Sequence, residues 1–301
     1  MSKRSVLLLA TNKQDYLQFA LNCAQSIQLH NPGLPVYIAT NIAPAATYPS
    51  VQFIPVPAEI AKLFIETKLY LDTFLQTEET LFIDSDCLVY ADLSPLFDEC
   101  KNSDVTVIGR AIPVEDYWSP NPEFARKEFS IDQSIIFNGG FYFIKKTDLT
   151  KRIFARAREI SERYDEYGFH RIKNKWKNEE NLLGIAMNAN KQLPIKDDGT
   201  FMADFTTDRR PRTLNVLTGA RVIRNPGAGN VSRSWYPATY SPVIIHFGGS
   251  NLKTYPYLSQ SMLLKLARTG VPVTVAGVIV SLFIHFPYKT YHRIKRILGA
   301  K

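Results

Sequence analysis

Short apolar runs alternate with segments of helical spacing over the first 83 residues, and this alternation constrains the fold more than any other feature. The predicted strands are 6–10, 36–39, 51–54 and 81–83, and the predicted helices are 15–29 and 58–75. Runs of this length are typical of buried parallel strands, whereas apolar residues three and four positions apart indicate amphipathic helices. The order predicts a doubly wound α/β sheet, which binds ligands at the carboxyl ends of its strands.

The rest of the chain continues the α/β pattern. Further strands are predicted at 105–109, 141–144 and 243–246, further helices at 149–164 and 179–188, and a loop-rich insert at 112–132. With 301 residues, 45% of them hydrophobic, the chain is long enough for one large α/β domain with an appendage. We expect a catalytic domain at 1–255 and a separate apolar and basic tail at 256–301.

Charge is distributed unevenly along the chain. Residues 209–301 contain 14 Lys and Arg and no Asp or Glu, whereas the whole chain has a formal net charge of +8. Such segregation indicates an anionic partner for the last third, for which an anionic membrane, a phosphorylated substrate and nucleic acid are candidates. No nucleic-acid-binding module is recognisable in the sequence, so nucleic acid is not the expected partner.

Cysteine usage and the first apolar run bear on the compartment. The three cysteines show no CxxC spacing, so neither a disulfide framework nor a structural zinc site is expected. The run at 6–10 is too short for the core of a signal peptide, and we interpret it as a buried strand. Both features favour a reducing, cytoplasmic setting.

Two acidic residues, Asp84 and Asp86, follow the predicted strand at 81–83. Side chains two apart in an extended chain project the same way, so both carboxylates can converge on one cation. Mg²⁺ and Mn²⁺ take oxygen ligands and bridge to substrate phosphates. An ordinary polar turn is the alternative, but an apolar strand that ends in two acids is costly unless the charges are used or solvated. The pattern therefore predicts a metal site.

Five segments resemble, in order along the chain, the glycosyltransferases related to glycogenin and to bacterial lipopolysaccharide galactosyltransferases. They are LATN at 9–12 with Tyr16, TKL at 67–69, the region around DSD at 81–97, FNGGF at 137–141, and HFGG at 246–249 with Lys253. These enzymes, often grouped as family 8, have the GT-A fold, a Rossmann-like mixed sheet flanked by helices. The resemblance covers about residues 6–253 and implies this fold.

The resemblance implies that Asp84, Asp86 and His246 bind Mn²⁺, or alternatively Mg²⁺. A histidine ligand suits Mn²⁺ better, because Mg²⁺ favours oxygen; a core histidine at a strand end is the alternative. Gly249 would let backbone N–H groups approach the diphosphate of a UDP-sugar, and Lys253 would supply positive charge. Lys253 lies seven residues after His246, whereas the family usually spaces them by six, so either the loop carries one extra residue or another base substitutes.

The resemblance also implies contacts with the rest of the donor. The predicted donor-binding residues are Thr11, Asn12, Tyr16, Lys68, Ser85, Asn138 and Gly139. The first three would hold uracil and ribose, although Tyr16 is almost equally compatible with the core. Lys68 would contact the donor phosphate or sugar, or else is a solvated helix lysine. Glycines inside an apolar strand indicate close backbone approach, so Asn138 and the next residue would touch the sugar.

Glu179 and Glu180 are the candidate catalytic residues. They begin the predicted helix at 179–188 and stand where the family has Asp-Gln beside the anomeric carbon. A carboxylate there would stabilise an oxocarbenium-like transition state or bond to sugar hydroxyls, and by position Glu180 is the better candidate. The alternative is that both are acids favoured by the dipole at a helix start.

The tail combines an apolar stretch at 271–286 with a basic end that contains five Lys and Arg. Sixteen helical residues rise about 24 Å, which is short of the roughly 30 Å hydrocarbon core of a bilayer. We therefore expect shallow attachment to an anionic membrane surface, at the cytoplasmic face, rather than a crossing. A buried strand or core helix is the alternative.

The expected function is Mn²⁺-dependent transfer of a hexose from a UDP-sugar to a glycan or lipid-linked saccharide, as in polysaccharide biosynthesis. The resemblance implies retention of the anomeric configuration. One alternative is a catalytically silent, membrane-docked nucleotide-sugar binding protein. Another is a sugar nucleotidyltransferase, but the segment LLLATNKQDY lacks the glycine-rich, basic phosphate loop that such an enzyme needs after its first strand.

Overall fold

The computed structural model describes residues 2–114, 122–205, 213–225 and 233–297. The chain divides into two compact units. Unit 1 comprises Met1–Ala20, Gly33–Ser85 and Leu93–Asp197, and unit 2 comprises Leu21–Pro32, Asp86–Asp92 and Asp198–Lys301. The predicted loop-rich insert at 112–132 falls partly on residues 115–121, which lie outside the described residues, and its described part is instead largely helical, at Pro122–Phe129.

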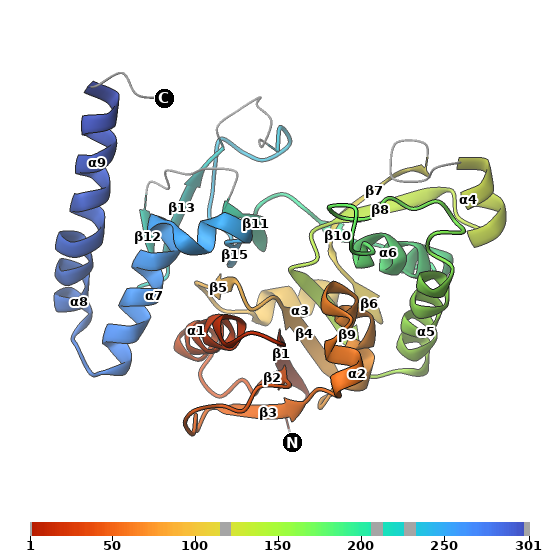
Figure 1. Cartoon of the computed structure of the whole chain (residues 1–301), viewed down its shortest axis with the longest axis horizontal. Coiled ribbons are helices and arrows are strands. Elements are labelled where there is room, and N and C mark those ends of the chain that lie inside the picture. Colours follow the sequence, from red (N-terminus) through yellow and green to blue (C-terminus); the bar gives the residue numbers. More distant parts are fainter. Residues whose placement is uncertain (1, 115–121, 206–212, 226–232, 298–301) are drawn as a thin grey trace. The chain divides into compact units, whose positions relative to one another are not determined.

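A six-stranded sheet with the order β3-β2-β1-β4-β9-β6 forms the centre of unit 1 (Figure 1). Its strands are β1 (Arg4–Ala10), β2 (Val36–Thr40), β3 (Val51–Pro55), β4 (Glu79–Ile83), β6 (Val105–Thr106) and β9 (Phe141–Lys145). The first four pair in parallel, and β9 is antiparallel to β4 and β6. The strand order reverses between β1 and β4, so their carboxyl ends form the switch point where open α/β sheets bind ligands.

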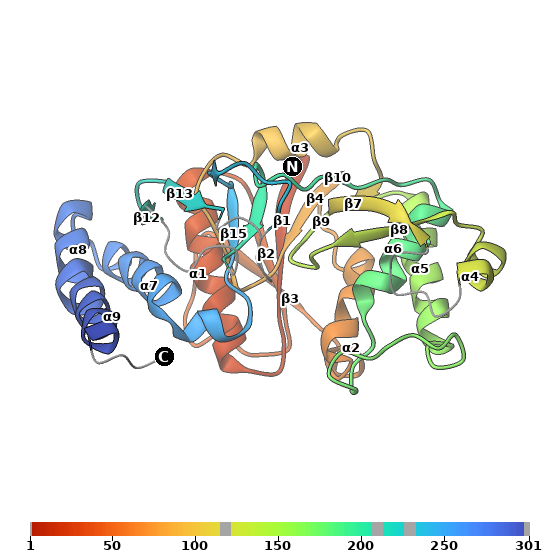
Figure 2. The ribbon, with the colours of Figure 1, turned by 90° about the horizontal axis from the view of Figure 1, so that it is seen from above.

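Helices and a small second sheet complete unit 1 (Figure 2). The helical elements are α1 (Gln14–His30), which continues into unit 2, α2 (Ala58–Ala61), η1 (Phe64–Thr73), α3 (Ser94–Cys100), α4 (Pro122–Phe129), α5 (Asp148–Glu162) and α6 (Glu179–Ala189). The second sheet has the order β10-β7-β8, with β7 (Ile108–Pro113), β8 (Gln133–Phe137) and β10 (Ile195–Lys196). The buried core includes Phe82, Tyr142, Ile153 and Leu182, so the apolar periodicity seen in the sequence faces inward.

The predicted helix at 58–75 is instead two pieces, α2 and the 3-10 helix η1. Phe64 has a φ of 57°, and a left-handed residue of this kind interrupts an α-helical ladder. Thr67 Oγ1 donates to Ile60 O at 2.9 Å and ties the two pieces together. The apolar spacing was therefore a correct sign of helical structure, but it did not reveal the break.

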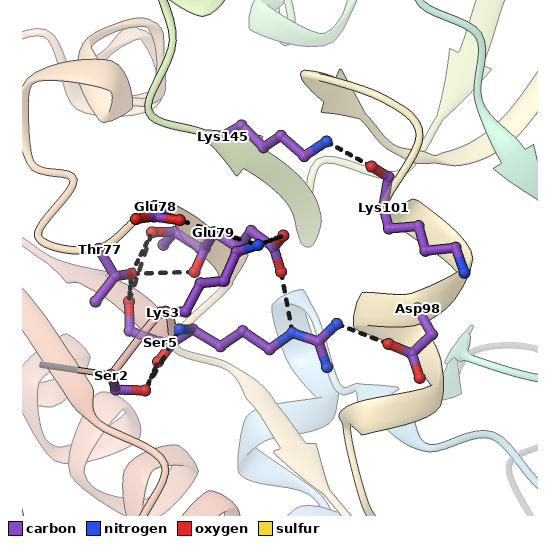
Figure 3. Close-up of polar contacts among 11 residues, drawn as sticks. Ser2, Lys3, Ser5, Thr77, Glu78, Glu79, Asp98, Lys101 and Lys145 are labelled. Atoms are coloured by element: carbon purple, nitrogen blue, oxygen red, sulfur yellow. Dashed lines mark hydrogen bonds and ion pairs between the residues drawn. The ribbon is translucent and has the colours of Figure 1, made fainter.

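The amino-terminal ends of β1 and β4 are joined by an ion-pair network (Figure 3). Arg4 pairs with Glu79 across the parallel ladder at 3.0 Å and with Asp98 at 2.6 Å. Burial acts to raise the pKa of Glu79, but its hydrogen bonds with Arg4 and Lys3 outweigh burial and lower it. This network stabilises the charged carboxylate and the register of the two strands that lead to the switch point.

Unit 2 contains two three-stranded sheets and the end of α1. One sheet has the order β11-β15-β5, with β5 (Cys87–Val89), β11 (Met202–Asp204) and β15 (Ile244–His246); the other contains β12 (Thr213–Asn215), β13 (Ala220–Arg224) and β14 (Thr239–Tyr240). Helix α7 (Tyr255–Arg268) packs along α1. Asn22 donates to Tyr257 Oη at 3.2 Å, and Gln25 donates to Leu264 O at 2.8 Å.

The tail of unit 2 is helical. After α7, the segments α8 (Val273–Val280), the π-helical turn η5 (Ser281–His285) and α9 (Phe286–Ile297) follow without interruption. Pro287 lacks an N–H for an α-helical ladder, and a π turn immediately before it accommodates the missing bond. Helix α7 holds this segment through Tyr255, whose ring stacks on Tyr288 at 4.3 Å between centroids. The tail is therefore not the buried strand that was one alternative.

One face of the tail helix is apolar and exposed. Val278, Leu282 and Phe286 are spaced four residues apart and are 58%, 60% and 67% exposed. Within the described part of the chain, Val273–Lys295 is the one helix that could cross a membrane, judged by length and composition alone. Its 23 residues rise about 34 Å, because the helix extends well past the apolar stretch at 271–286.

Candidate functional site

A lysine and three carboxylates gather at the carboxyl end of β4 in unit 1. This acidic cluster consists of Lys68, Asp84, Glu179 and Glu180. Lys68 Nζ donates to Asp84 Oδ2 at 2.7 Å and to Gly139 O at 2.8 Å, and it lies 3.4 Å from Glu179 Oε1. The lysine is therefore not a solvated helix residue. Element η1 directs it inward, where its positive charge offsets the negative charges of two carboxylates.

The two adjacent glutamates have different surroundings. Asn178 caps α6 by accepting the N–H of Glu180 at 3.0 Å, and acids are favoured in the first turn of a helix. The side chain of Glu179 is only 5% exposed and faces Lys68. Glu180 is half-buried, and its Oε1 accepts the N–H of Gly139 at 2.7 Å. One acid is thus enclosed, while the other is oriented by the backbone and remains partly accessible.

Burial and mutual charge alter the ionisation of this cluster. Burial raises the pKa of Glu179 to about 7; Lys68 opposes this shift, and the neighbouring Glu180 adds to it. Burial alone would lower the pKa of Lys68, but Asp84 and Glu179 hold it well above its ordinary value. The lysine therefore stays charged, and Glu179 exchanges its proton near neutral pH.

Gly139 lies where three oxygen atoms converge. A Cβ at this position would lie 3.0 Å from Glu179 Oε1, Glu180 Oε1 and the Tyr142 hydroxyl. Among the described residues, the buried hydroxyl of Tyr142 has no hydrogen-bond partner. The next glycine is also held, because Gly140 N donates to Asn138 Oδ1 at 2.8 Å. The FNGGF segment thus brings backbone, rather than side chains, against the acids.

An asparagine pair marks the carboxyl ends of β1 and β2 in unit 1. Asn12 has a φ of 68°, its N–H donates to Asn41 Oδ1 at 2.8 Å, and its side chain donates to Ala61 O at 2.7 Å. An open groove of about 560 Å³ is lined by residues 40–44, 53–56 and Ala58. This volume lies within the roughly 300–1,000 Å³ of small-molecule sites.

In unit 2, strand register aligns a second set of polar groups around His246. His246 is paired with Asp204 across β11–β15 and with Cys87 across β15–β5. Asp204 Oδ1 lies 2.8 Å from His246 Nδ1, and Asp204 Oδ2 accepts from Arg233 at 3.0 Å. On the other side of the ring, Nε2 lies 3.2 Å from Asp86 Oδ1. This histidine cluster consists of Asp86, Asp204, Arg233 and His246.

The donor set of the histidine cluster fits a divalent cation. Ligand atoms of Asp86, Cys87 and His246 lie within 4.8 Å of one another. A carboxylate on Nδ1 leaves Nε2 as the ligating nitrogen, which is the usual arrangement around metal-binding histidines. Burial alone would lower the pKa of His246, but Asp86 and Asp204 raise it well above its ordinary value. A cation must therefore displace a proton from this ring.

The other predicted site residues are distributed over both units. In unit 1, Thr11 and Ser85 are buried, and Tyr16 on α1 is half-buried with Lys13 Nζ 5.6 Å from its ring centroid. In unit 2, Gly249 has a φ of 66° and begins η4 (Gly249–Lys253), which ends at the exposed Lys253. The structure thus brings Lys68, Gly139 and the glutamates together, and separately Asp86 and His246.

Three polar residues of these clusters were not predicted from sequence: Asn41, Asp204 and Arg233. Asn41 could have been found, because it follows a predicted strand as directly as Thr11 and Asn12 do. Asp204 lies 42 residues before His246, in the segment MADF, and only strand pairing reveals their contact. Arg233 carries no recognisable motif.

Comparisons with known proteins agree with this architecture. Neither protein-family models nor curated protein sequences match the chain. The solved structure of the galactosyltransferase LgtC, in complex with donor and acceptor sugar analogs, is similar with a TM-score of 0.50 and 16% identity, over 81% of this chain and 87% of LgtC. The apo structure of the bifunctional glycosyltransferase WbbM is similar with a TM-score of 0.52 and 15% identity, over 82% of this chain and 46% of WbbM.

The chain thus spans about half of WbbM. At these identities the likeness establishes the fold, and the expectation of a GT-A fold with a mixed sheet flanked by helices is confirmed.

Proposed function

We propose that this protein transfers a hexose from a UDP-sugar to a hydroxyl group of a glycan or lipid-linked saccharide. The observation that carries the proposal is the acidic cluster, in which Lys68 compensates Asp84 and Glu179 while Gly139 orients Glu180. Charged groups gathered and compensated at the switch point of an α/β sheet are typical of a ligand site rather than of a structural core. The GT-A fold supports sugar transfer over other reactions of α/β proteins.

The donor nucleotide would bind along the carboxyl ends of β1 and β2. Asn12 and Asn41 present amide groups there, beside the open groove. Thr11 and Tyr16 follow the same strand and are proposed to contact uracil and ribose. The sugar would then lie towards the acidic cluster, with Asn138 and Gly139 beneath it.

The divalent cation, Mn²⁺ in preference to Mg²⁺, would be held by Asp86 and His246, with Asp204 orienting the imidazole. Asp84 remains a predicted further ligand on the strength of the sequence spacing. When bound, the cation neutralises charge on the diphosphate leaving group. Gly249 and Lys253 are proposed to approach the same diphosphate through backbone N–H groups and a side-chain cation.

Glu180 is the proposed catalytic carboxylate. It is half-buried, and the hydrogen bond from Gly139 N–H orients its side chain. A carboxylate beside the anomeric carbon stabilises positive charge as the bond to UDP breaks and the acceptor oxygen forms the new bond, while the proton of the acceptor hydroxyl passes to the departing diphosphate. Glu179 is enclosed and paired with Lys68, so we assign it to positioning and to setting the charge of the cluster. Retention of configuration is part of the proposal.

Release of UDP tests the proposal directly. The wild-type protein, incubated with UDP-glucose or UDP-galactose and Mn²⁺, should release UDP, whereas Asp86→Ala and His246→Ala should release about 100-fold less, the loss expected for an electrostatic catalytic group. Glu162→Gln changes an exposed glutamate of α5 and serves as a matched control with unchanged turnover. No turnover of any UDP-hexose by the wild type, even slow hydrolysis, would rule out the proposal.

The tail helix is proposed to attach the enzyme to an anionic membrane at its cytoplasmic face. Its apolar stripe is followed by two exposed cations, Lys289 and Arg293, which suit the anionic headgroups of such a surface. The double variant Leu282→Glu/Phe286→Glu should no longer sediment with phosphatidylglycerol vesicles, and its UDP release in solution should equal that of the wild type. Sedimentation that is equal for this variant and the wild type would contradict the attachment.

A further inference from the structure

The two ends of the loop 170–178, between α5 and α6 of unit 1, are joined by the hydroxyl of Tyr164. Tyr164 Oη donates to His170 O at 2.7 Å and accepts the N–H of Asn178 at 3.0 Å. Arg171 forms a bidentate pair with Asp165, at 2.9 Å and 2.6 Å. These contacts tie together the two ends of the loop.

The tip of this loop is a tight hairpin. Ile172 and Trp176 pair through two backbone hydrogen bonds of 2.7 Å and 3.1 Å. Lys173 and Asn174, in the turn between them, have φ values of 51° and 55°, the positive φ that a type I′ turn requires at both central residues. Left-handed residues other than glycine cost about 1–3 kcal/mol each, and such strain is concentrated at functional sites.

A third strained residue faces the hairpin. The ring of Phe64 stacks on that of Trp176, with centroids 5.2 Å apart and planes inclined by 28°. Phe64 is the residue whose left-handed φ ends the α-helical ladder and starts η1. Phe64 thus contacts the hairpin whose turn contains two further non-glycine residues with positive φ, Lys173 and Asn174.

The same two segments carry the acidic cluster. Phe64 lies four residues before Lys68, and Trp176 lies three residues before Glu179. The two rings are in contact, and Lys68 Nζ lies 3.4 Å from Glu179 Oε1. Four residues of 3-10 helix rise about 8 Å, so the stack lies about this far from Lys68 along η1. The aromatic stack is thus joined to the acidic cluster through η1 on one side and through the start of α6 on the other.

The hairpin also presents positive charge. Lys173 and Lys175 are exposed, and within the part of the chain that the structure describes neither forms an ion pair. Lys175 Nζ lies 5.0 Å from the centroid of the Trp176 ring. By contrast, Lys177 at the base donates to Ser161 O at 2.7 Å and approaches Glu66 at 3.5 Å. Lys177 at the base thus stabilises the loop, whereas the two lysines at the tip have exposed side chains.

We propose that Phe64, Trp176, Lys173 and Lys175 form an acceptor subsite that recognises a saccharide carrying a phosphate group. This inference rests on the proposed function, because it places the acceptor next to the acidic cluster. The aromatic rings provide an apolar face against which a sugar ring packs, and the two compact ammonium groups suit a phosphate dianion. A sugar phosphate and a lipid-diphosphate-linked sugar share this chemistry.

Binding is tested with the full chain saturated with UDP and Mg²⁺, so that the donor site is filled and the cation is diamagnetic. The soluble probes are glucose 1-phosphate and methyl α-glucoside, compared by saturation-transfer-difference NMR. Replacing Lys173 and Lys175 by glutamine should weaken glucose 1-phosphate about 3- to 10-fold and leave the neutral glycoside unchanged. Trp176→Leu should weaken both about 10-fold, and Trp176→Phe should restore most of the loss.

The matched charge control is the double variant Lys101→Gln/Lys127→Gln, which changes two exposed lysines of unit 1 outside the loop. It should bind both glucose 1-phosphate and methyl α-glucoside like the wild type. A second arm presents the same sugar as a polyprenyl diphosphate in phosphatidylcholine vesicles. Tighter binding there than to glucose 1-phosphate identifies the lipid-linked form as the ligand. The subsite is refuted if both probes bind equally, or if the tip variants bind glucose 1-phosphate like the wild type.

Failure of the subsite and failure of the proposed function are distinguishable, because donor hydrolysis is measured without acceptor. Normal Mn²⁺-dependent UDP release with unchanged probe binding in the tip variants overturns the subsite alone. Absence of UDP release in the wild type, together with the predicted binding losses, overturns the transferase proposal and leaves a sugar-phosphate site.

Discussion

Replacing Glu179 by glutamine should stabilise the protein increasingly as the pH rises. The enclosed carboxyl has a pKa raised by burial from the ordinary 4.5 to about 7, even though Lys68 lies 3.4 Å away. Between these two values the unfolded chain releases this proton while the folded chain keeps it. The folded state therefore loses stability as the pH rises, and above about 7 the loss is complete.

The interval between 4.5 and about 7 corresponds to about 3 kcal/mol, at 1.36 kcal/mol per pKa unit. Glutamine keeps the shape of the protonated acid and removes this cost. The free energy of unfolding of Glu179→Gln, measured by urea denaturation with circular dichroism, should exceed that of the wild type by an amount that grows by about 3 kcal/mol from pH 4.5 to pH 8.

The exposed Glu162→Gln provides the baseline, because an exposed carboxylate has no such burial cost. A difference between Glu179→Gln and the wild type that stays constant from pH 4.5 to pH 8 would refute the reasoning. It would mean that the ion pair with Lys68 fully offsets burial, and that the cluster carries one more negative charge at neutral pH than we infer.

The remaining predictions concern the glycine of the acidic cluster and the histidine cluster. Gly139→Ala should lower UDP release and should lower the free energy of unfolding, measured by urea denaturation, by about 1–3 kcal/mol, because its methyl group would press on three oxygens. The control is Gly277→Ala, whose methyl group would meet nothing within 4 Å and should lower neither quantity. Mn²⁺ affinity, measured by calorimetry, should rise with pH beyond the ordinary histidine range, because the raised pKa of His246 lets protons compete; affinity that is constant from pH 6 to pH 9 would contradict this. Asp204→Asn should weaken Mn²⁺ binding about 10- to 100-fold with Asp204→Glu recovering part of it; equal affinity in all three proteins would exclude an orienting role.

Local patterns in the sequence were sufficient for the strands of the central sheet and for α1, α5 and α6, whereas the short strands β5, β8 and β10 to β14 and the helices α3 and α4 were not predicted. The apolar run at 6–10 is β1, and the run before Asp84 is β4, because a buried strand must be continuously apolar over its length. The positions of Asp84 and Thr11 at strand ends followed from the same patterns. The GT-A fold was also expected from the order of five short motifs, and the solved structures confirm it.

The partners of the polar residues were decided only by tertiary structure. Lys68 could be interpreted as solvated or functional until η1 was seen to direct it towards Asp84 and Glu179. Asp204 was invisible in the sequence, because its contact with His246 depends on the register of two strands distant in the chain.

The difference between Glu179 and Glu180 has the same origin. In the sequence they are two equal acids at a helix start, and only packing buries one against a lysine and leaves the other to the N–H of Gly139. Phe64, where the predicted helix breaks, likewise contacts Trp176, more than a hundred residues away. Sequence periodicity reports which face of an element is buried, whereas charge compensation and strain depend on what that face meets.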